Sequence, residues 1–144
     1  MASFRGEKYF MSNMYPCTVR MNVNGRIITM NSSEAVFQAL RCKNVTDIDK
    51  FVGINGFASK KLSHSLEARP DWFDINLDVM RYALKCKFMQ NPDLAEKLMN
   101  YEGEIVEVNE WNDTFWGVCN GKGENHLGKL LMELRDELRK GQTA

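Results

Sequence analysis

The sequence predicts a mainly helical α+β domain that carries a small β-hairpin or sheet. Three observations lead to this prediction. Five leucines at helical spacing occupy residues 127–138, a hairpin pattern occupies residues 19–30, and residues 105–108 form one more short β-branched run. The length of 144 residues suits one domain over residues 1–144, with enough buried surface for a core and a cleft.

The predicted hairpin is centred on the dipeptide Asn24-Gly25. This dipeptide favours a type I′ turn, because both central positions of that turn need a positive φ. A two-residue loop then pairs the strands as follows: Val23 with Arg26, Met21 with Ile28, and Val19 with Met30. The apolar residues of the two strands share one face in this register, which supports it.

The first predicted helix follows the hairpin. Ser32 or Ser33 can cap its N-terminus, and Glu34 stands in its first turn, where the helix dipole favours a negative charge. Val36 and Phe37 contribute to its apolar face. The stretch Asn44-Val45-Thr46-Asp47 is expected to end this helix.

Two short helices, one longer helix and a further helix after Pro92 are expected in the middle of the chain. The short ones cover 47–52 and 56–66, the second with Ala58 and Leu62 facing inward. Asp71 or Asp74 begins a longer helix. Pro92 ends that helix and suits the first turn of the one after it, which runs through Leu94 and Leu98.

The C-terminal third is predicted to contain a strand, a long loop and the last helix. Residues 105–108 read as a strand, and residues 109–125 read as a glycine-rich loop. The last helix is predicted from five leucines at spacings of three, four, seven and eleven: Leu127, Leu130, Leu131, Leu134 and Leu138.

The charge and composition exclude several classes of function. The chain has 19 basic and 19 acidic residues, whereas proteins that grip duplex nucleic acid carry a basic excess. Its four cysteines form no C-x-x-C pair, and both histidines are isolated, so no metal and no cofactor are expected. No apolar run approaches the roughly 20 residues of a membrane span. We therefore expect a cytoplasmic protein without a membrane partner.

Three segments combine polar and aromatic residues beyond what a core requires: 10–16, 69–72 and 112–117, the last followed by Asn125. The acidic candidates in or near them are Glu34, Glu107 and Asp113, and flat surfaces for a base are Phe10, Trp72 and Trp116. These residues predict a polar and aromatic cleft for a nucleotide-like ligand. The reaction does not follow from them.

Each candidate also has a purely structural interpretation. Glu34 could serve only the helix dipole, Asp113 could only close an Asx turn, and the tryptophans could belong to the core. Lys60 suits a solvated helix face. Glu107 is expected to point outward unless its side of the strand lines a cleft. Gly117 suits a tight turn or a close approach of phosphate.

The same segments resemble the NADAR (YbiA-like) family. The resembling stretches follow one another in the family's order: Phe10–Pro16 (FLSNFYP), Ser33–Ala39 (SEHAYQA), Lys60–Leu62 (AKxLGR), Arg69–Trp72 (RxDW), Met80 with Lys87–Phe88 (M…KF), Asp113–Gly117 (DxfWG) and Asn125–Arg135 (NxLGxxLMxxR). The chain departs from the pattern at Ala35, which replaces a histidine, and at Ser63-His64, which replaces Gly-Arg. No catalytic role can therefore be given to a histidine after Glu34.

The resemblance implies a single mainly helical NADAR domain that is an N-glycosidase, a hydrolase of N-glycosyl bonds. The first expected substrate is ADP-ribosylated guanine, free or within DNA or RNA, and the alternative is a ribosylamino-pyrimidine phosphate of early riboflavin biosynthesis. A rival from another class is a module that binds ADP-ribose or a related nucleotide without cleaving it. Calorimetric binding without turnover would distinguish that rival.

The resemblance also implies the site residues. The expected catalytic residues are Glu34, Asp113, Lys60 and Glu107, and the expected substrate-binding residues are Phe10, Asn13, Trp72, Arg69, Trp116, Gly117 and Asn125. The lysine could attack the opened sugar as a Schiff-base nucleophile, given a depressed pKa, or a carboxylate could activate water directly. Either route predicts that one cleft brings Glu34 and Asp113 next to the ribose.

Overall fold

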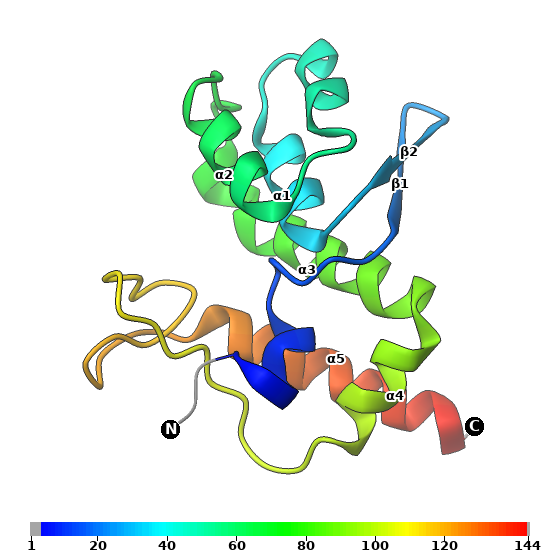
Figure 1. Ribbon diagram of the computed structural model, residues 1–144, viewed down its shortest axis with the longest axis vertical. Coiled ribbons are helices and arrows are strands. Elements are labelled where there is room, and N and C mark those ends of the chain that lie inside the picture. Colours follow the sequence, from blue (N-terminus) through cyan, green and yellow to red (C-terminus); the bar gives the residue numbers. More distant parts are fainter. Residues whose placement is uncertain (1–3, 144) are drawn as a thin grey trace. The chain divides into compact units, whose positions relative to one another are not determined.

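The computed structural model describes residues 4–143, with side chains as far as residue 141 (Figure 1). Within these residues, seven helices accompany one two-stranded antiparallel sheet, as the mainly helical prediction requires. The residues fall into two compact units. The central unit is Asn13–Asn91, and the terminal unit joins the residues up to Ser12 with those from Pro92 onward. None of the described helices has the length and apolar character that a membrane crossing needs. A single domain over residues 1–144 stays a prediction.

The hairpin of the central unit has the predicted register. Strand β1 (Val19–Val23) pairs with β2 (Arg26–Met30), with Met21 opposite Ile28. Asn24 and Gly25 have φ values of 52° and 84°, so both turn positions adopt the positive φ that a type I′ turn needs. Four apolar side chains of one face are buried: Val19, Met21, Ile28 and Met30.

Helix α1 (Ser33–Arg41) is the core element of the central unit. Ser32 is its N-cap, since the Ser32 hydroxyl accepts a hydrogen bond from the Ala35 N–H at 3.1 Å. Both strands, the 3₁₀ helix η2 (Val45–Phe51), α2 (Gly56–His64) and α3 (Trp72–Gln90) pack against it (Figure 1). All residues of α1 as far as Ala39 are therefore buried, including the polar ones.

Helix α2 packs against α1 with small residues, and here the prediction was wrong. Ala58 is exposed and Leu62 is only half-buried, whereas Gly56, Ser59 and Ser63 are buried. A Cβ at residue 56 would lie 2.7 Å from the Met14 sulfur and 3.2 Å from the Glu34 Cβ. The interface thus selects small side chains that allow close approach, and hydrophobic periodicity does not detect such a face.

Helix α3 begins after its N-cap residue Asp71, which settles the choice between Asp71 and Asp74. It ends at Gln90, and α4 (Pro92–Asn100) starts at the proline, as predicted. The buried face of α3 contains one charged residue among apolar ones: Trp72, Met80, Ala83, Leu84, Lys87 and Phe88.

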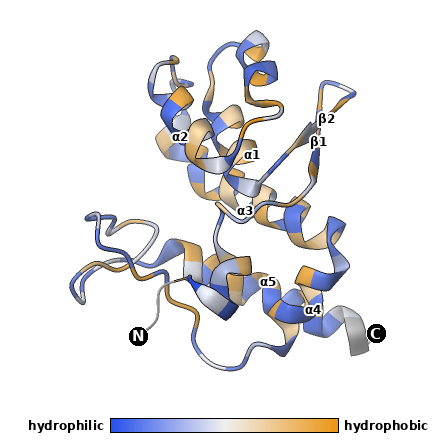
Figure 2. Cartoon of the chain, in the orientation of Figure 1, coloured by the Kyte–Doolittle hydropathy of each residue, from blue (hydrophilic) through white to orange (hydrophobic). Residues whose placement is uncertain are grey.

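The terminal unit contains the 3₁₀ helix η1 (Gly6–Met11), α4 and α5 (His126–Thr143). Apolar and polar residues alternate along α5 in Figure 2. Four of its five predicted core leucines are buried and Leu138 is half-buried, so the leucine spacing predicted this helix correctly. Leu94 and Leu98 of α4 are buried, and α4 packs against α5.

Residues 105–108 do not form the predicted strand. In the described part of this segment, sheet-type pairing is limited to an isolated bridge from Val108 to Val118. The backbone of residues 99–107 is held instead by side chains of α5 and of Asn125 just before it. Nearly every buried backbone polar group needs a hydrogen-bond partner, and side chains supply those partners here.

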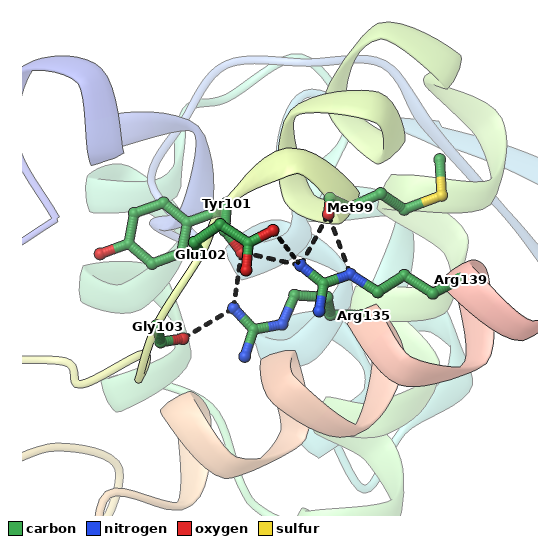
Figure 3. A network of polar contacts seen from close by, with 6 residues as sticks. All are labelled: Met99, Tyr101, Glu102, Gly103, Arg135 and Arg139. Carbon is green, nitrogen blue, oxygen red and sulfur yellow. Dashed lines mark hydrogen bonds and ion pairs between the residues drawn. The ribbon is translucent and has the colours of Figure 1, made fainter.

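Two arginines of α5 bind the first part of this segment (Figure 3). Arg139 donates from Nε and Nη2 to the Met99 carbonyl at 2.9 and 2.7 Å. The Arg135 Nη1 donates to the carbonyls of Tyr101 and Gly103, both at 2.8 Å. The Arg139 guanidinium also lies 3.5 Å from the Glu102 carboxylate. The C-terminal end of α4 is thereby capped by guanidinium groups.

Asn125 binds the second part of the segment. Its Nδ2 donates to the Ile105 carbonyl, and its Oδ1 accepts from the Glu107 N–H, both at 3.0 Å. Gly128, on the first turn of α5, leaves room for this arrangement, because a Cβ there would overlap the Ile105 carbonyl and both amide atoms of Asn125.

We expect Gly128→Ala to lower the free energy of unfolding by ~1–3 kcal/mol, the usual cost of an extra methyl group in a tightly packed site. Gly141→Ala is the matched control, since residue 141 also lies in α5 and its Cβ would have no atom within 4 Å. Alanine is a better helix former than glycine, so the control should be slightly more stable than the parent. Urea unfolding measures both. Equal stability of the two variants would contradict the contact at Gly128.

Candidate functional site

In the central unit, Glu34 is buried in the first turn of α1, with 8% of the residue exposed. The Gln38 side chain donates to Glu34 Oε2 at 3.4 Å, and the Glu34 backbone N–H donates to the Asn13 carbonyl at 3.1 Å. The N-cap role belongs to Ser32. Glu34 is therefore a buried carboxylate at the positive end of a helix dipole, a setting that suits an anion.

Asn13 connects the residues before the hairpin to the start of α1. Its Oδ1 accepts from the Ser33 hydroxyl at 2.8 Å, and its Nδ2 donates to the Met80 sulfur at 3.3 Å. The side chain is buried, so these protein contacts fix its orientation next to Glu34. A role for Asn13 in substrate binding stays a prediction.

Trp72 is the first residue of α3 and is 7% exposed. Its ring is tilted against Phe37 of α1, with centroids 5.0 Å apart. Arg69 lies three residues earlier and is exposed. It forms a bidentate ion pair with Asp71, with both N–O distances at 3.0 Å, and its hydrogen bond lowers the pKa of Asp71. The ion pair lies at the N-terminal end of α3, where Asp71 is the N-cap residue. The burial of Trp72 agrees with the interpretation that this tryptophan belongs to the core.

The two lysines of interest have opposite surroundings. Lys60 is exposed on α2. Lys87 of α3 is fully buried, and its Nζ lies 5.0 Å from the ring centroid of Phe88 and 5.6 Å from that of Tyr15. Burial lowers the pKa of Lys87 to about 8, against an opposing effect of the Cys17 thiol. In the sequence, Lys87 was noted only within the M…KF stretch that resembles the family, and no role was assigned to it.

In the terminal unit, Asp113 closes the Asx turn that its position before Thr114 predicted. Its Oδ1 accepts from the N–H groups of Phe115 and Trp116 at 3.2 and 2.9 Å. Trp116 is half-buried, with its ring edge-on to Phe115 at a centroid distance of 4.8 Å. The carboxylate therefore sets the direction in which the chain presents this tryptophan.

Glu107 is half-buried and lies against the backbone of Gly117. A Cβ at residue 117 would overlap the Glu107 carboxylate and the Glu107 carbonyl oxygen. The absence of a side chain at Gly117 therefore leaves the space that Glu107 occupies. The Val118 N–H also donates to the Glu107 carbonyl at 2.7 Å. The Glu107 side chain accepts a hydrogen bond from Asn109 at 3.1 Å.

Two expected substrate-binding residues have structural contacts in this unit. The Asn125 amide is buried against residues 105 and 107, and its φ of 54° is one that asparagine tolerates better than most residues. Phe10 of η1 is buried, and the Lys97 Nζ lies 6.0 Å from its ring centroid. Their predicted contact with substrate remains a prediction.

The structure thus divides the predicted residues into two groups. The central unit holds Asn13, Glu34, Lys60, Arg69 and Trp72, and the terminal unit holds Phe10, Glu107, Asp113, Trp116, Gly117 and Asn125. That Glu34 and Asp113 line one cleft stays a prediction. From the sequence, Gln38 was noted only within the Ser33–Ala39 stretch, with no role assigned to it, and Asn109 was not singled out.

The surroundings of two of the four cysteines do not favour the thiolate form that binds metal ions. Cys17, Cys42, Cys86 and Cys119 form no disulfide bond, and burial raises the pKa of Cys42 and Cys86, which favours the neutral thiol over the thiolate that binds metals. Over residues 4–143, no three His, Cys, Asp or Glu side chains gather in a way that could hold a metal ion.

Comparison with known proteins gives the following similarities. The NADAR domain pattern matches residues 3–139. The fold is similar to the NMR structure of the Escherichia coli protein YbiA, with a TM-score of 0.83 and 30% sequence identity over 99% of this chain and 85% of that one.

Two curated relatives illustrate the sequence similarity. A riboflavin biosynthesis protein of Vibrio vulnificus is 35% identical over 133 residues, which are 90% of this chain and 35% of that protein. The N-glycosidase YbiA of Shigella boydii is 44% identical over 78 residues, 53% of this chain and 48% of that protein. The matched segments cover less than half the length of each of these relatives.

Proposed function

Because the chain belongs to the NADAR family, we propose that it is an enzyme that hydrolyses the bond between a ribose carbon and a base nitrogen. The family match over residues 3–139 carries this proposal. Relatives that are named N-glycosidases, such as YbiA of Shigella boydii and a protein of Nostoc punctiforme, support the reaction type.

The reaction makes specific demands on the residues. As the C1′–N bond breaks, positive charge develops on the ribose and negative charge on the departing base. We assign Glu34 to the ribose, because it is a buried carboxylate held by an amide. We assign Asp113 and Glu107 to proton transfer and to activation of water, and Trp116 to stacking on the base.

Hydrolysis can follow one of two routes, which differ in the group that attacks C1′. In the first, a carboxylate removes a proton from water while the oxygen bonds to C1′ and the base leaves with a proton. In the second, the Lys60 amine attacks C1′ of the opened sugar, the base leaves, and water later hydrolyses the resulting imine. Borohydride added during turnover would trap a sugar on residue 60 only in the second route. A Lys60→Ala variant should then lose the trapped product.

The proposed substrate is ADP-ribosylated guanine, free or within DNA or RNA. The zero net charge favours a protein that reads one modified nucleotide rather than the duplex around it. Ribosylamino-pyrimidine phosphates are a second candidate, supported by relatives from Vibrio vulnificus and Zea mays that are named riboflavin biosynthesis proteins. Both substrate types present a ribose bonded to nitrogen.

Incubating the protein with each substrate separately and measuring the released base by chromatography tests the proposal. Release from ADP-ribosyl-guanine with none from the pyrimidine confirms the first substrate, and the reverse result selects the second. No release from either, with calorimetric binding of ADP-ribose, would replace the enzyme with a nucleotide-binding module. Each substrate incubated without the protein serves as the control for spontaneous release.

We expect Trp116→Ala to raise KM by about tenfold or more with a smaller change in kcat, since stacking a base on an aromatic ring contributes ~1–3 kcal/mol. Trp111→Ala is the matched control, because Trp111 is exposed on the same loop and has no role in the proposal. Steady-state kinetics measure both variants. A KM for Trp116→Ala equal to that of the control would remove Trp116 from substrate binding.

A further inference from the structure

Asn109 occupies the space between two candidate carboxylate residues of the terminal unit and is 4% exposed. Its Nδ2 donates to Glu107 Oε2 at 3.1 Å and to the Asp113 carbonyl at 2.8 Å. Its Oδ1 accepts from the N–H groups of Asp113 and Trp111 at 3.0 and 3.3 Å. An amide offers two donor hydrogens and two acceptor lone pairs, so this side chain is fully used.

The backbone around Asn109 is fixed as well. The Asn109 N–H donates to the Val118 carbonyl at 2.9 Å, and the Val118 N–H donates back to the Glu107 carbonyl at 2.7 Å. Gly117, which precedes Val118, leaves the room in which the Glu107 side chain lies. The amide of residue 109 is therefore held at a defined place between the Glu107 carboxylate and the loop that carries Asp113.

The chemistry at this place requires an amide. The group toward Glu107 must donate, since a carboxylate only accepts, and the group toward the Asp113 and Trp111 N–H groups must accept. An aspartate at 109 would keep the acceptor and replace the donor by a negative charge next to the Glu107 carboxylate. Like charges at hydrogen-bond distance repel, so that carboxylate would turn away.

We propose that Asn109 is a positioning residue that sets the place of the Glu107 carboxylate relative to the Asp113 loop. This inference rests on the proposed function, in which both carboxylates serve one reaction. Residues 109–117 contain no helix or strand, and Asn112 has a φ of 63°, so side-chain hydrogen bonds rather than a regular element hold the loop. A displacement of about 1 Å at a reacting group can cost ~100-fold in rate.

We expect Asn109→Asp to lower kcat by ~10–100-fold with little change in KM, because a carboxylate is displaced while the substrate-binding surface remains. Asn44→Asp is the control, since it adds the same charge at an exposed position of the central unit that has no role in the proposed reaction. The control should keep kcat within about twofold of the parent.

A double-mutant cycle separates positioning from a general loss of structure. In a Glu107→Gln background the carboxylate is absent, so Asn109→Asp should lower kcat by less than about twofold further. If Asn109→Asp lowers kcat by the same factor in the parent and in the Glu107→Gln variant, the inference is overturned. If Asn109→Asp fails to fold, as urea unfolding would reveal, the uncharged Asn109→Ser takes its place in the cycle.

Crystal structures of the parent and of Asn109→Asp give a readout that does not depend on activity. A Glu107 carboxylate turned away from residue 109 in the variant supports the positioning role even if no tested substrate is cleaved. A carboxylate unmoved in the variant overturns the role, whatever the activity. Failure of the proposed function is read separately, from the absence of base release by the parent protein.

Discussion

Replacing Glu34 by glutamine is expected to lower turnover by ~100-fold or more while the chain stays folded. The carboxylate is buried at the N-terminal end of α1 and accepts a hydrogen bond from Gln38. Next to a ribose that gains positive charge, such a fixed negative charge stabilises the transition state more than the ground state. Glutamine has nearly the same shape and lacks the charge.

Because glutamine and glutamate have nearly the same shape, a loss of activity in this variant can be attributed to the missing charge. A glutamine at 34 can keep the packing of the Glu34 Cβ near Gly56, so the unfolding free energy should fall only by the lost charge–dipole interaction, about 0.3–1 kcal/mol. Glu67→Gln is the matched control, since Glu67 is exposed and forms a surface ion pair with Lys43. Initial rates of base release and urea unfolding, measured on both variants, separate chemistry from stability. A folded Glu34→Gln variant with the parent's kcat would remove Glu34 from the mechanism.

The elements that the sequence predicted correctly are those fixed by local rules. Asn24-Gly25 determines the hairpin, because few other residues adopt two positive φ angles in succession. The leucine spacing determines α5, because a helix whose apolar residues share one face must bury that face. In both cases the information lies within a few residues of the element itself.

The errors arose where distant side chains decide the structure. The run at 105–108 was predicted to be a strand, but it forms only one isolated bridge, to Val118. The Asn125 side chain, eighteen to twenty residues away, binds the backbone of Ile105 and Glu107. Pattern analysis of α2 selected Ala58 and Leu62, whereas the helix interface needs the small residues Gly56 and Ser59. The periodicity of hydrophobic residues does not show where two helices pack so closely that only small side chains fit.

In the candidate site too, a feature set by neighbouring residues was predictable, and features set by the way the chain folds around a side chain were not. The turn at Asp113 was predictable, since an aspartate binds the N–H groups two and three residues ahead of it. The role of Asn109 was not, because its contacts with Glu107, Trp111 and Asp113 exist only once the loop has folded around it. The burial of Lys87 between Tyr15 and Phe88 likewise depends on how the chain before the hairpin crosses α3.

Asp113→Asn is expected to lower turnover by ~100-fold while leaving the Asx turn intact. The turn uses only Oδ1, which accepts from the N–H groups of Phe115 and Trp116, and an asparagine carbonyl oxygen can accept both bonds. The substitution therefore removes the charge and preserves the geometry. Its unfolding free energy should stay within ~0.5 kcal/mol of the parent.

Asp113→Ala is the informative comparison, because it removes the charge and the turn together. Loss of two hydrogen bonds to the backbone should lower the unfolding free energy by ~1–2 kcal/mol, and the freed loop should misplace the Trp116 ring, so KM should rise as well. If Asp113→Asn keeps the parent's kcat and only Asp113→Ala loses activity, Asp113 is a turn residue and the proton-transfer role passes to Glu107. If both lose kcat and only Asp113→Ala raises KM, the carboxylate acts in the chemistry while its Oδ1 orients the ring that holds the base.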